Sequence, residues 1–569
     1  MTAVLGLCSY THDSAAALLI DGHLVGFVEE ERLSQVKHTK DYPRLAVEWL
    51  LKRADITPQE IDAVAYNFSG PRYLKAVPRA ISLLTSGETR SRAVPRAHGF
   101  ATVAVRTMRR RQALGRMFPR ARVHTLAHHR AHQMYAFAAS GLPEAAVLIV
   151  DSLGETQTTT IAHGRQPVPG RATVRTLHAV EDPASLGYVY GAVTEHLGWR
   201  RGDEEGTVMA LAGVGDPARF RALFARAVRT TPTAFTVDPD VFPPRTLQHG
   251  AARVTPRFVA ATCPPRAADE PVEQVHCDLA AALQERTEDV LLHLARMARR
   301  LTGSSRLCVG GGVAANCVGI GRVIEEGLFD QVFVPPAPGD SGTAIGASAA
   351  VHVSTARQSL SGIAGECYLG PSWSPPILDW ARRPGLQVRQ LSEDRASFLA
   401  EQLARGLIIG LFQGRVEAGP RALGNRSILA SPMSEGVVDR LNAEVKFREP
   451  FRPFAPVVPA ERAAEYFSLG QDAPFMSMAS RVTAKAHEQI PAVVHANGTA
   501  RVQTVTPTQN PFLHAVLDAF AQRTGVPVLI NTSLNVKGRP ICGTPEMALD
   551  CLMDSGLDAL LLEDWWITK

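Results

Sequence analysis

The stretch HTLAHHRAHQMYAF, residues 124–137, places three histidines within five positions. On a helix, residues four positions apart lie on one face, so His128 and His132 would point the same way. Two neighbouring imidazoles can hold a divalent metal ion if other groups complete the coordination. They can equally be polar residues on a solvated face, and the spacing alone leaves both interpretations open.

Carboxylates would complete such a site for most divalent ions, and two aspartates in expected turns are candidates. Asp151 ends the apolar run AAVLIVD, and Asp340 lies in the loop PPAPGDSGTAIGA before a helix of small residues. Aspartate in a turn more often caps a helix or stabilises the turn itself, which is the alternative for each. Spacing in the sequence cannot by itself bring either aspartate to the histidines.

A dense group of cations lies in the C-terminal part of the chain. These cations alternate with Gly, Pro and Phe, and they are Arg415, Arg421, Arg426, Lys446, Arg448, Arg452 and Arg501. Guanidinium groups bind phosphate and carboxylate through paired hydrogen bonds, so the pattern favours an anion pocket, although any single arginine could be structural. The segment VLINTSLN adds Asn531, Ser533 and Asn535 at the expected C-terminal end of a strand, where α/β sheets bind ligands.

The elements that must position these residues follow a repeated pattern. AVLGLCSY, SAAALLIDG and HLVGFVEEER predict three strands, the last two joined by a DG turn. AAVLIVD and QTTTIAHG predict a second strand–turn–strand unit, and two such units suggest an internal duplication. RLCVGGGVAANC predicts a strand, a glycine-rich turn and a helix, and the amides of such a turn can reach a phosphate or ribose. A triple glycine alone is a weak signal, because many such turns are only tight.

The chain has 569 residues, too many for one hydrophobic core, so we expect at least two domains. A net charge of +5 suits anionic ligands and gives no reason to expect a nucleic-acid or membrane partner. The eight cysteines form no CxxC pair, which favours reduced thiols over a disulfide framework or a cysteine zinc site. No signal peptide or membrane-spanning run is recognised, so we expect a cytoplasmic enzyme.

Two further segments have a distinct composition. Residues 87–122 are rich in arginine and are expected to form a solvated helical surface, with a lid or acceptor-binding element as the alternative. The looser pattern over residues 351–376 predicts a linker, with a boundary near residue 360. After it, EDRASFLAEQLARG predicts a helix and LIIGLFQG predicts a strand.

The chain resembles the O-carbamoyltransferases of the NodU and cephalosporin carbamoyltransferase type, which include the enzyme that carbamoylates tobramycin. The resemblance runs nearly end to end and is carried, in this order, by HDSAAALLIDG with EEER, HHRAH, VDSLGE, GGGVAAN, PPAPGDSGTAIGA, EAGPRALGNRS, FREPFRPFAP and NTSLN. It implies an α/β chain with a duplicated, actin-like (ASKHA) domain over residues 1–355 that binds metal and nucleotide and transfers the carbamoyl group. It also implies a YrdC-like α/β domain over residues 366–569 that forms carbamoyl-adenylate.

The resemblance also implies roles for individual residues. The implied metal ligands are His128, His132, Asp151 and Asp340, with iron expected and manganese or zinc as alternatives. The catalytic residue is expected to be His12, close to the transferring carbamoyl group, with Asp13 as the alternative. The nucleotide-binding residues expected in the first domain are Gly154, Glu155, Gly311, Gly312 and Asn316. The carbamoyl phosphate and ATP contacts expected in the second domain are Arg415, Arg421, Lys446, Arg452, Arg501, Asn531 and Ser533.

Two positions depart from the family pattern. Thr207 stands in GTVMALA where a lysine is common, so a phosphate contact is lost or is supplied elsewhere, for example by Arg200 or Arg201. Ser152 replaces a glycine in DSLGE, where its hydroxyl adds bulk near the expected phosphate path but can still donate a hydrogen bond.

The function implied by the resemblance has two steps. Carbamoyl phosphate and ATP, the latter with Mg²⁺, yield carbamoyl-adenylate, and an acceptor hydroxyl then displaces AMP. The expected acceptor is a small hydroxylated secondary metabolite, such as a macrolide, an ansamycin or an aminoglycoside, and a homodimer is an expected assembly. The alternatives are a modification enzyme of the tRNA threonylcarbamoyladenosine type and a nucleotide-gated, actin-like binding protein.

Overall fold

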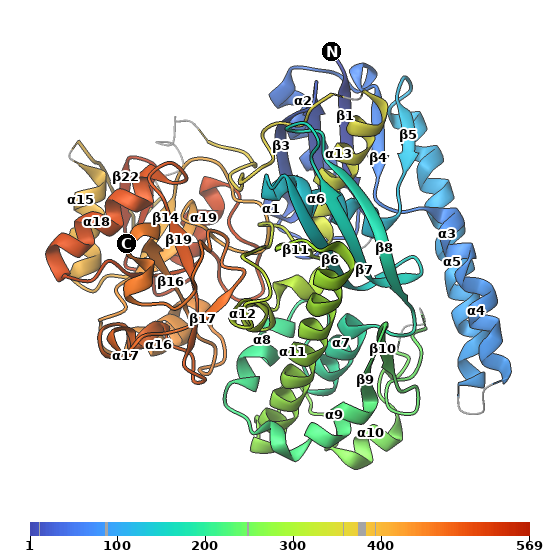
Figure 1. The fold of residues 1–569 in the computed structure, drawn as a ribbon. Helices are drawn as coiled ribbons and strands as arrows, with labels where there is room; N and C mark the ends of the chain where they lie inside the picture. The colour runs from blue at the N-terminus through green and yellow to red at the C-terminus, as the bar shows by residue number, and fades with distance from the viewer. Residues whose placement is uncertain (11, 86–88, 247–249, 357, 374–382, 393) are drawn as a thin grey trace. The chain divides into compact units, whose positions relative to one another are not determined.

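The computed structural model describes residues 1–10, 12–85, 89–246, 250–356, 358–373, 383–392 and 394–569, which form two compact units (Figure 1). Unit 1 comprises residues 1–27 and 40–366. Unit 2 comprises residues 28–39 and 367–569, so a short N-terminal segment belongs with the C-terminal part of the chain. Both units mix helices and sheets, in agreement with the α/β class expected from the sequence.

Among its described residues, unit 1 contains two five-stranded sheets. The first has the order β3-β2-β1-β4-β5, with β1 (Ala3–Cys8), β2 (Ala15–Ile20), β3 (His23–Glu29), β4 (Ala63–Tyr66) and β5 (Arg122–Thr125). The second has the order β8-β7-β6-β11-β12, with β6 (Glu144–Gly154), β7 (Gln157–Arg165), β8 (Thr173–Glu181), β11 (Arg306–Gly310) and β12 (Gln331–Phe333). In each, the central strand pairs antiparallel with the strand that follows it and parallel with the strand on its other side. The two sheets repeat one topology, and the strands expected in both strand–turn–strand units are present.

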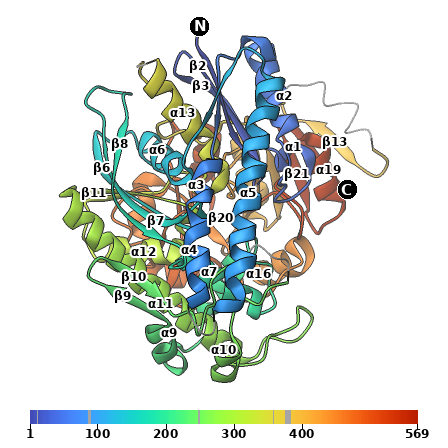
Figure 2. The same ribbon diagram turned by 90° about the vertical axis from the view of Figure 1, so that its right-hand side faces the viewer.

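Helices make up most of the rest of unit 1. They include α2 (Arg44–Ala54), α3 (Gly70–Leu74), α4 (Ala76–Ser82), α5 (Arg90–Met117), α6 (His128–Ser140), α7 (Leu186–His196), α8 (Glu205–Ala212), α9 (Arg221–Ala227), α10 (Pro256–Ala261), α11 (Gln274–Thr302), α12 (Cys317–Glu325) and α13 (Thr343–Thr355), with a hairpin of β9 (Val228–Thr231) and β10 (Ala234–Val237). The arginine-rich segment forms the long helix α5, and Figure 2 shows α4 alongside it. Most of its arginines are exposed, but Arg96 is buried and pairs with Asp182.

A close crossing of α6 and α13 holds two parts of the candidate site together. Gly346 in α13 lies so near α6 that a Cβ atom there would be 1.9 Å from the Ala131 carbonyl oxygen. Gly342, one turn earlier, would place a Cβ 2.5 Å from Cε1 of Tyr135. Because only glycine permits these approaches, the sequence GTAIG brings the start of α6, at His128, near the start of α13.

Unit 2 is built on an eight-stranded mixed sheet of order β13-β22-β21-β14-β15-β20-β16-β19 among its described residues. Its strands are β13 (Gln387–Gln390), β14 (Ile409–Phe412), β15 (Arg426–Ala430), β16 (Ala455–Pro459), β19 (Gln503–Val505), β20 (Leu529–Ser533), β21 (Ala559–Leu562) and β22 (Trp565–Thr568), and β17 (Ala479–Arg481) pairs with β18 (Thr499–Arg501). Its helices include α1 (Glu31–Ser34), α15 (Arg395–Ala404), α16 (Val437–Arg440), α17 (Ala484–Gln489), α18 (Pro511–Thr524) and α19 (Pro545–Met553).

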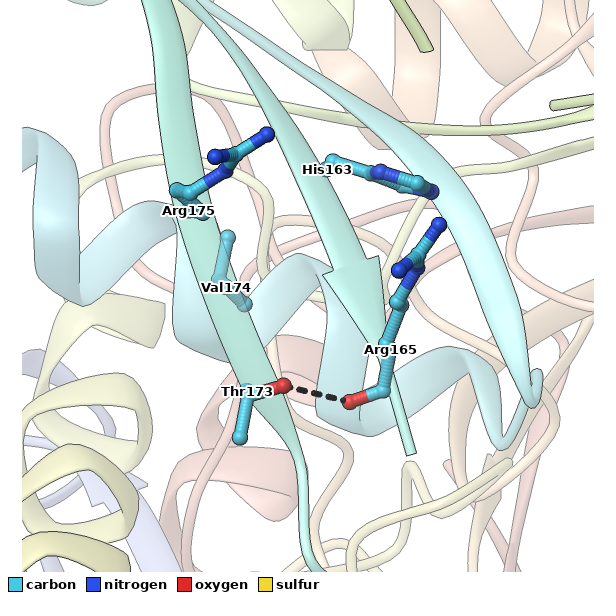
Figure 3. A pocket seen from close by; sticks show the side chains of 5 residues that line it. All are labelled: His163, Arg165, Thr173, Val174 and Arg175. Carbon is cyan, nitrogen blue, oxygen red and sulfur yellow. Dashed lines mark hydrogen bonds between the residues drawn. The ribbon is translucent and has the colours of Figure 1, made fainter. Parts of the chain in front are cut away.

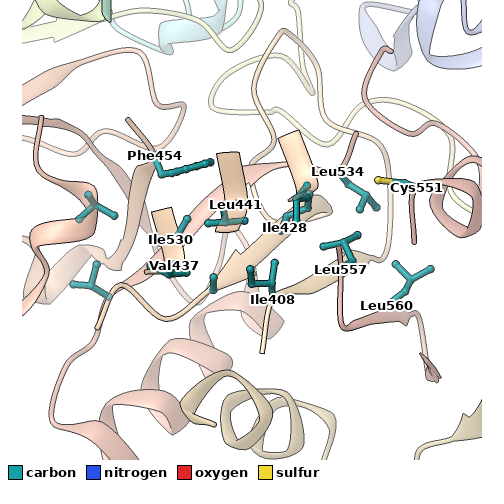
Figure 4. Close-up of a cluster of buried hydrophobic side chains, with 14 of the residues drawn as sticks. Ile408, Ile428, Val437, Leu441, Phe454, Ile530, Leu534, Cys551, Leu557 and Leu560 are labelled. Atoms are coloured by element: carbon teal, nitrogen blue, oxygen red, sulfur yellow. The ribbon is translucent and has the colours of Figure 1, made fainter. Parts of the chain in front are cut away.

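Alternate residues of the central strands enter two different apolar clusters, as the two faces of a sheet require. Figure 4 shows the first cluster, in which Ile408, Ile530 and Leu560 meet Leu441 and Phe454. The second cluster includes residues of the same strands and of α15 and α18, which pack against each other. The sheet is therefore buried on both faces, and its loops remain for binding.

The element expectations for this region are confirmed with two corrections. The helix and strand expected after the linker are present as α15 and β14. The linker expected over residues 351–376 begins too early, because α13 continues to Thr355, and residues 374–376 lie outside the described residues. Asn531 lies inside β20, which continues to Ser533, where the sequence pattern placed it at the end of a strand.

We predict that Gly346→Ala destabilises unit 1, because the added methyl carbon would collide with the Ala131 carbonyl oxygen. Overpacking typically costs about 1–3 kcal/mol, and backbone atoms cannot rotate away as a side chain can. The matched control is Gly206→Ala in α8, where a Cβ meets nothing within 4 Å and alanine favours the helix. Thermal denaturation should give a lower Tm for Gly346→Ala and an unchanged or higher Tm for the control. A parental Tm for Gly346→Ala would contradict the close crossing.

Candidate functional site

Four buried side chains of unit 1 converge on one point. The ligand atoms of His128, His132, Asp151 and Asp340 all lie within 4.8 Å of one another, and we refer to these residues as the four-ligand cluster. Nε2 of His128 lies 3.3 Å from a carboxylate oxygen of Asp151 and 3.3 Å from one of Asp340. Nε2 of His132 lies 3.7 Å from Asp340 and 3.1 Å from Nε2 of His128. The structure thus brings together the four residues that the family resemblance implied as metal ligands.

Three separate elements supply these side chains. The two histidines lie in the first turns of α6, Asp151 lies in β6, and Asp340 begins a short 3-10 turn before α13. Phe68 stacks on the His128 ring with centroids 4.4 Å apart. Gly154 allows β6 to approach the same ring, because a Cβ there would lie 2.8 Å from Cδ2 of His128. Packing from both sides therefore fixes the orientation of this imidazole.

The electrostatics of the cluster suit a bound cation. Burial opposes ionisation of Asp151, but the hydrogen bond with His128 lowers the pKa of this carboxyl below its ordinary value. Burial also opposes ionisation of Asp340, and the charge of His128 holds the pKa of that carboxyl well below its ordinary value. Two imidazoles and two ionised carboxylates are ligands that iron, manganese and zinc accept. A cation among them would satisfy both imidazole nitrogens at once, so the residues present fit the expected metal.

His129, between the two histidine ligands, has a different environment. Its Nδ1 atom lies 3.2 Å from the hydroxyl of Thr160, which also accepts a hydrogen bond from the Gln133 amide. Burial lowers the pKa of His129 to about 3, with Asp151 acting in the opposite direction. The ring is therefore neutral at ordinary pH, and its contacts stabilise the packing of α6 on β7.

The residues expected to bind nucleotide occupy different positions around the four-ligand cluster. Gly312 borders it, because its backbone nitrogen donates to a carboxylate oxygen of Asp151 at 3.3 Å. Gly311 has a φ of 87° and lies so close to the backbone of β6 that a side chain would collide with it. Asn316 is further engaged, because its amide exchanges two hydrogen bonds with Gln284 and caps α12. The two glycines thus place backbone atoms close to the cluster. The Asn316 side chain instead already has hydrogen-bond partners within the protein.

Glu155 and Gly154 support the start of α6. The Glu155 carboxylate accepts hydrogen bonds from the backbone nitrogens of His128, at 3.1 Å, and Ser69, at 2.9 Å. Burial raises the pKa of Glu155, and the nearby His128 lowers it. A carboxylate at a helix N-terminus satisfies amides that have no partner within the helix. The structure places both residues beside the metal-ligand histidines.

His12 and Asp13 form a pair near the cluster. Nδ1 of His12 lies 2.8 Å from Oδ2 of Asp13, and the His12 side chain is 47% exposed. Desolvation lowers the pKa of His12, but the hydrogen bond with Asp13 and the negative charges of Asp340 and Asp151 raise it to about 9. Asp13 has a φ of 65°, which turns the chain after His12. His12 is thus a partly accessible imidazole in the field of the metal-ligand carboxylates.

Sequence reasoning did not identify Arg245, which lies directly beside the cluster. Its guanidinium donates to the hydroxyl of Ser152, the residue after the ligand Asp151, and to the Ser152 carbonyl oxygen at 3.4 Å. The same group lies over the ring of Tyr188, 5.0 Å from the centroid. Nothing in the motif pattern around residue 245 signals this position, because the arginine reaches β6 from a loop more than ninety residues further along the chain.

In unit 2, Lys446 is buried at the end of a short π-helical turn, Leu441–Lys446. Its Nζ atom donates to the Ser533 hydroxyl at 3.2 Å, and to the carbonyl and side-chain oxygens of Asn535 at 3.1 and 2.8 Å. Burial lowers the pKa of Lys446 to about 7, and the charges of Arg448 and Arg452 add to this effect. The structure thus joins two residues expected at an anion site, Lys446 and Ser533.

Further cations gather around this lysine. Burial lowers the pKa of Arg448 well below its ordinary value, and so do the neighbouring charges of Arg452, Arg501 and Arg421. Arg448 donates to the Asn442 side chain at 2.8 Å, and Glu449 lies 3.7 Å from Arg452. Crowding of like charges is costly unless an anion offsets it. Arg448 was seen in the sequence as part of the cation group but was not expected as a ligand contact.

The loop that carries Arg421 is folded around one carboxylate. Oε1 of Glu417 accepts hydrogen bonds from the backbone nitrogens of Leu423, Asn425 and Arg426, each at 2.8 to 2.9 Å. Asn531 supports the same loop from β20, because its amide donates to the Ala422 carbonyl oxygen at 3.3 Å. This predicted contact residue is fully buried, so it positions the loop.

Arg415 is placed differently from the other predicted cations of unit 2. It donates to the backbone carbonyl oxygens of Gly370 at 2.9 Å and Leu369 at 2.5 Å. Those contacts attach the start of the glycine-rich loop to residues 369–370.

A separate pocket on the surface of β7 and β8 has a volume of about 360 Å³ (Figure 3). It is lined by His163, Arg165, Thr173, Val174 and Arg175. Glu144 already pairs with His163 at 2.5 Å and lies 3.6 Å from Arg165. None of the predicted site residues lines this pocket, and we assign it no part in the chemistry.

The chain is similar to known proteins over most of its length. The profile of the carbamoyltransferase N-terminus matches residues 3–349, and that of the carbamoyltransferase C-terminus matches residues 400–569. Nodulation protein NolNO of Sinorhizobium fredii is 33% identical over 99% of this chain and 79% of its own length. An uncharacterised protein of Synechocystis sp. is 33% identical over 100% of this chain and 97% of its own length. The 3′-hydroxymethylcephem-O-carbamoyltransferase of Streptomyces clavuligerus is 39% identical over 47% of this chain and 49% of its own length.

Two general features accompany these matches. All eight cysteines are buried free thiols, as the sequence predicted. Among the described residues, no helix is both long and apolar enough to cross a membrane.

Because the two profiles cover most of the sequence and two relatives align over nearly all of it, the chain belongs to the carbamoyltransferase family and is a carbamoyl-transferring enzyme.

Proposed function

We propose that the protein is an ATP-dependent O-carbamoyltransferase that uses carbamoyl phosphate and transfers the carbamoyl group to a hydroxyl of a small-molecule natural product. The observation that carries this proposal is the four-ligand cluster, because two imidazoles and two carboxylates converge beside a glycine-rich turn. We further propose that unit 1 is a duplicated, actin-like domain and that unit 2 is a YrdC-like domain. The repeated strand order of the two sheets of unit 1 supports the first assignment.

Unit 2 would perform the activating reaction. Carbamoyl phosphate and water give carbamate and phosphate, and carbamate then attacks the α-phosphorus of ATP, forming carbamoyl-adenylate as pyrophosphate leaves. The crowded cations Arg421, Arg448, Arg452 and Arg501 suit these polyanions, because guanidinium groups bind phosphate oxygens in pairs. Buried Lys446 would add a compact positive charge and hold the end of β20 in place.

Unit 1 would perform the transfer. His128, His132, Asp151 and Asp340 would hold a divalent metal ion, with iron expected, which would supply Lewis-acid stabilisation of charge on the phosphate or carbonyl oxygens. The acceptor oxygen forms a bond to the carbamoyl carbon, the bond from that carbon to the adenylate oxygen breaks with its electron pair left on the AMP phosphate, and the hydroxyl proton passes to a base, for which neutral His12 or Asp13 is the candidate. His12 would act at the carbamoyl group, and Gly312 would present its backbone near Asp151.

The acceptor class rests on relatives. The Streptomyces clavuligerus relative is by its name an O-carbamoyltransferase of a hydroxymethyl group on a cephem. A hydroxyl on a secondary metabolite is therefore the acceptor that we propose. Incubation with labelled carbamoyl phosphate, ATP and a panel of hydroxylated natural products would identify it. Product formation that needs both ATP and carbamoyl phosphate supports the proposal, and turnover without ATP would reject it.

We predict that the purified protein binds about one transition-metal ion per chain at the four-ligand cluster. Replacing both His128 and His132 by alanine should remove it, because two of the four ligands are lost. His163→Ala is the matched control, since this histidine pairs with Glu144 on β7, away from the cluster. Elemental analysis should find metal in the parent and the control only. Equal metal in the double variant would refute the assignment.

Variants of unit 2 should lose the activating step alone. Arg421→Ala and Lys446→Ala each remove a positive charge from the cation group, at a cost on the order of 2–5 kcal/mol in binding an anionic substrate. Release of pyrophosphate from ATP and carbamoyl phosphate should therefore fall sharply. The control is Lys485→Ala, which removes a half-buried lysine that pairs with Glu465. Synthetic carbamoyl-adenylate should restore product formation by both variants, and failure of this rescue in folded protein would count against the division of work.

His12→Ala should show the reverse defect. Pyrophosphate release should persist, while carbamoylated product should fall by roughly 10²-fold or more. Because Asp13 raises the pKa of His12, the imidazole is protonated at neutral pH and can donate to the carbamoyl oxygen.

The pH profile separates the two roles of His12. A donor role predicts that product formation declines as pH rises through the His12 pKa, whereas a general-base role predicts an increase over the same range. His12→Asn keeps hydrogen-bonding capacity without titrating. If this variant transfers the carbamoyl group at the parental rate between pH 6 and 9, the general-base role of His12 is wrong and Asp13 becomes the better candidate.

A further inference from the structure

Arg245 makes no ion pair with a carboxylate among the described residues, and the negative charge of Asp151 acts on it only at longer range. It contacts the hydroxyl and carbonyl oxygens of Ser152 and the ring of Tyr188. Within the part of the chain that the structure describes, no acidic side chain lies within ion-pair distance of this guanidinium, and its buried Nε atom has no hydrogen-bond partner. Positive charge at this depth is costly unless an anion accompanies it.

Several neighbouring arginines pair with carboxylates, whereas Arg92 donates to the backbone carbonyl oxygens of Pro244 and Ala252. Arg201 lies 3.5 Å from the Glu195 carboxylate, and Arg253 donates to the same carboxylate at 2.8 Å. Arg96 pairs with Asp182. Arg200, the other residue considered for a phosphate contact, lies 2.7 Å from Asp203. Arg245 is therefore the arginine at Ser152, next to a cluster ligand, whose charge has no carboxylate partner.

The placement of Arg245 is built into the fold. Ser152 directly follows the cluster ligand Asp151, and its backbone oxygen also accepts a hydrogen bond from Ser185 at 2.7 Å. Ser185 caps α7, the helix that carries Tyr188. Gly187 in the same turn lies so near Ser152 that a Cβ would be 3.0 Å from its Cα. Ser152 and the ring of Tyr188 thus hold the Arg245 guanidinium close to Asp151.

We propose that Arg245 binds the phosphate of the adenylate in unit 1 and acts on it together with the four-ligand cluster. This proposal rests on the proposed function. As the acceptor oxygen bonds to the carbamoyl carbon, the carbon–oxygen bond to AMP breaks and its electron pair remains on the AMP phosphate. The phosphate gains negative charge in that step, and a fixed guanidinium stabilises charge where it develops. Ser152, which departs from the family glycine, serves here as the oxygen that orients the arginine.

The charge that this role needs is present across ordinary pH. Burial lowers the pKa of Arg245 to about 10, and the charges of Arg201 and Arg253 contribute to the lowering. The group therefore stays protonated in solutions near neutrality. Its proton is held throughout the transfer, so Arg245 acts by binding and by charge.

The test uses AMP as the probe and the full chain as the protein. Calorimetric titration should show AMP binding to Arg245→Gln weakened by roughly 10- to 100-fold, the range for a lost hydrogen bond to a charged group. Arg253→Gln, a neighbouring cation that already has an acidic partner, should change the affinity by less than about 3-fold. Ser152→Gly should give an intermediate loss, since the arginine keeps its charge but loses its anchor. Arg245→Lys should retain part of the affinity.

A second measurement assigns the bound AMP to unit 1. With Mn²⁺ as the paramagnetic probe in the four-ligand cluster, the ³¹P signal of AMP should broaden in the parent and much less in Arg245→Gln. Parental AMP affinity in a folded Arg245→Gln protein, or equal losses for Arg245→Gln and Arg253→Gln, would overturn the proposal. Pyrophosphate release from ATP and carbamoyl phosphate should be unaffected by Arg245→Gln. Its absence in the parent would instead reject the proposed function, whatever AMP does.

Discussion

The burial of two carboxylates against two imidazoles is the constraint on which unit 1 depends. An ionised group without a partner inside a protein costs several kcal/mol, so Asp151 and Asp340 need His128 or a cation at short range. The elements that deliver them must therefore hold their relative positions closely. Glycines make these close approaches possible. Gly346 permits the crossing of α6 and α13, and Gly154 permits β6 to approach the histidine rings.

Unit 2 solves the opposite electrostatic problem. Its candidate site collects cations, and burial together with their mutual repulsion lowers the pKa values of Lys446 and Arg448. The backbone around them is fixed before any ligand binds, because Glu417 gathers three amides of the glycine-rich loop. A site that is already ordered in this way loses little further conformational entropy when it binds an anion. The two units thus carry complementary sites, one suited to a metal ion and one suited to polyanions.

Much of the architecture could be predicted from local pattern. The strands β1, β2 and β6 are apolar runs bounded by turn residues, and α6 shows the i, i+4 histidine spacing that places two rings on one face. The convergence of Asp151 and Asp340 on α6 could not be derived from spacing, since long-range contacts have no local signature. It was reached through family resemblance.

Other features of the sites had no signal in the sequence at all. Arg245 reaches Ser152 across the fold from a loop that lacks any motif, and the anchoring role of Asn531 depends on which loop lies over β20. The linker was placed too early because the alanine, serine and threonine residues near residue 351 do not show the alternation of apolar and polar residues typical of a helix. Packing against α6 nonetheless stabilises α13. Propensity is a weak guide where tertiary contacts decide.

The membership of residues 28–39 in unit 2 has a consequence for how the chain is made. Gly419 donates to the Glu29 carboxylate at 2.7 Å and accepts from Arg32 at 2.7 Å, and a Cβ on Gly543 would collide with the Arg32 carbonyl oxygen. During synthesis this segment emerges first, yet its partners are translated more than three hundred residues later. Unit 2 therefore cannot complete itself as the ribosome proceeds from one end to the other. The segment must remain available, undocked, until the last third of the polypeptide has left the ribosome, and a fragment that starts at residue 367 would lack a structural part of its own domain.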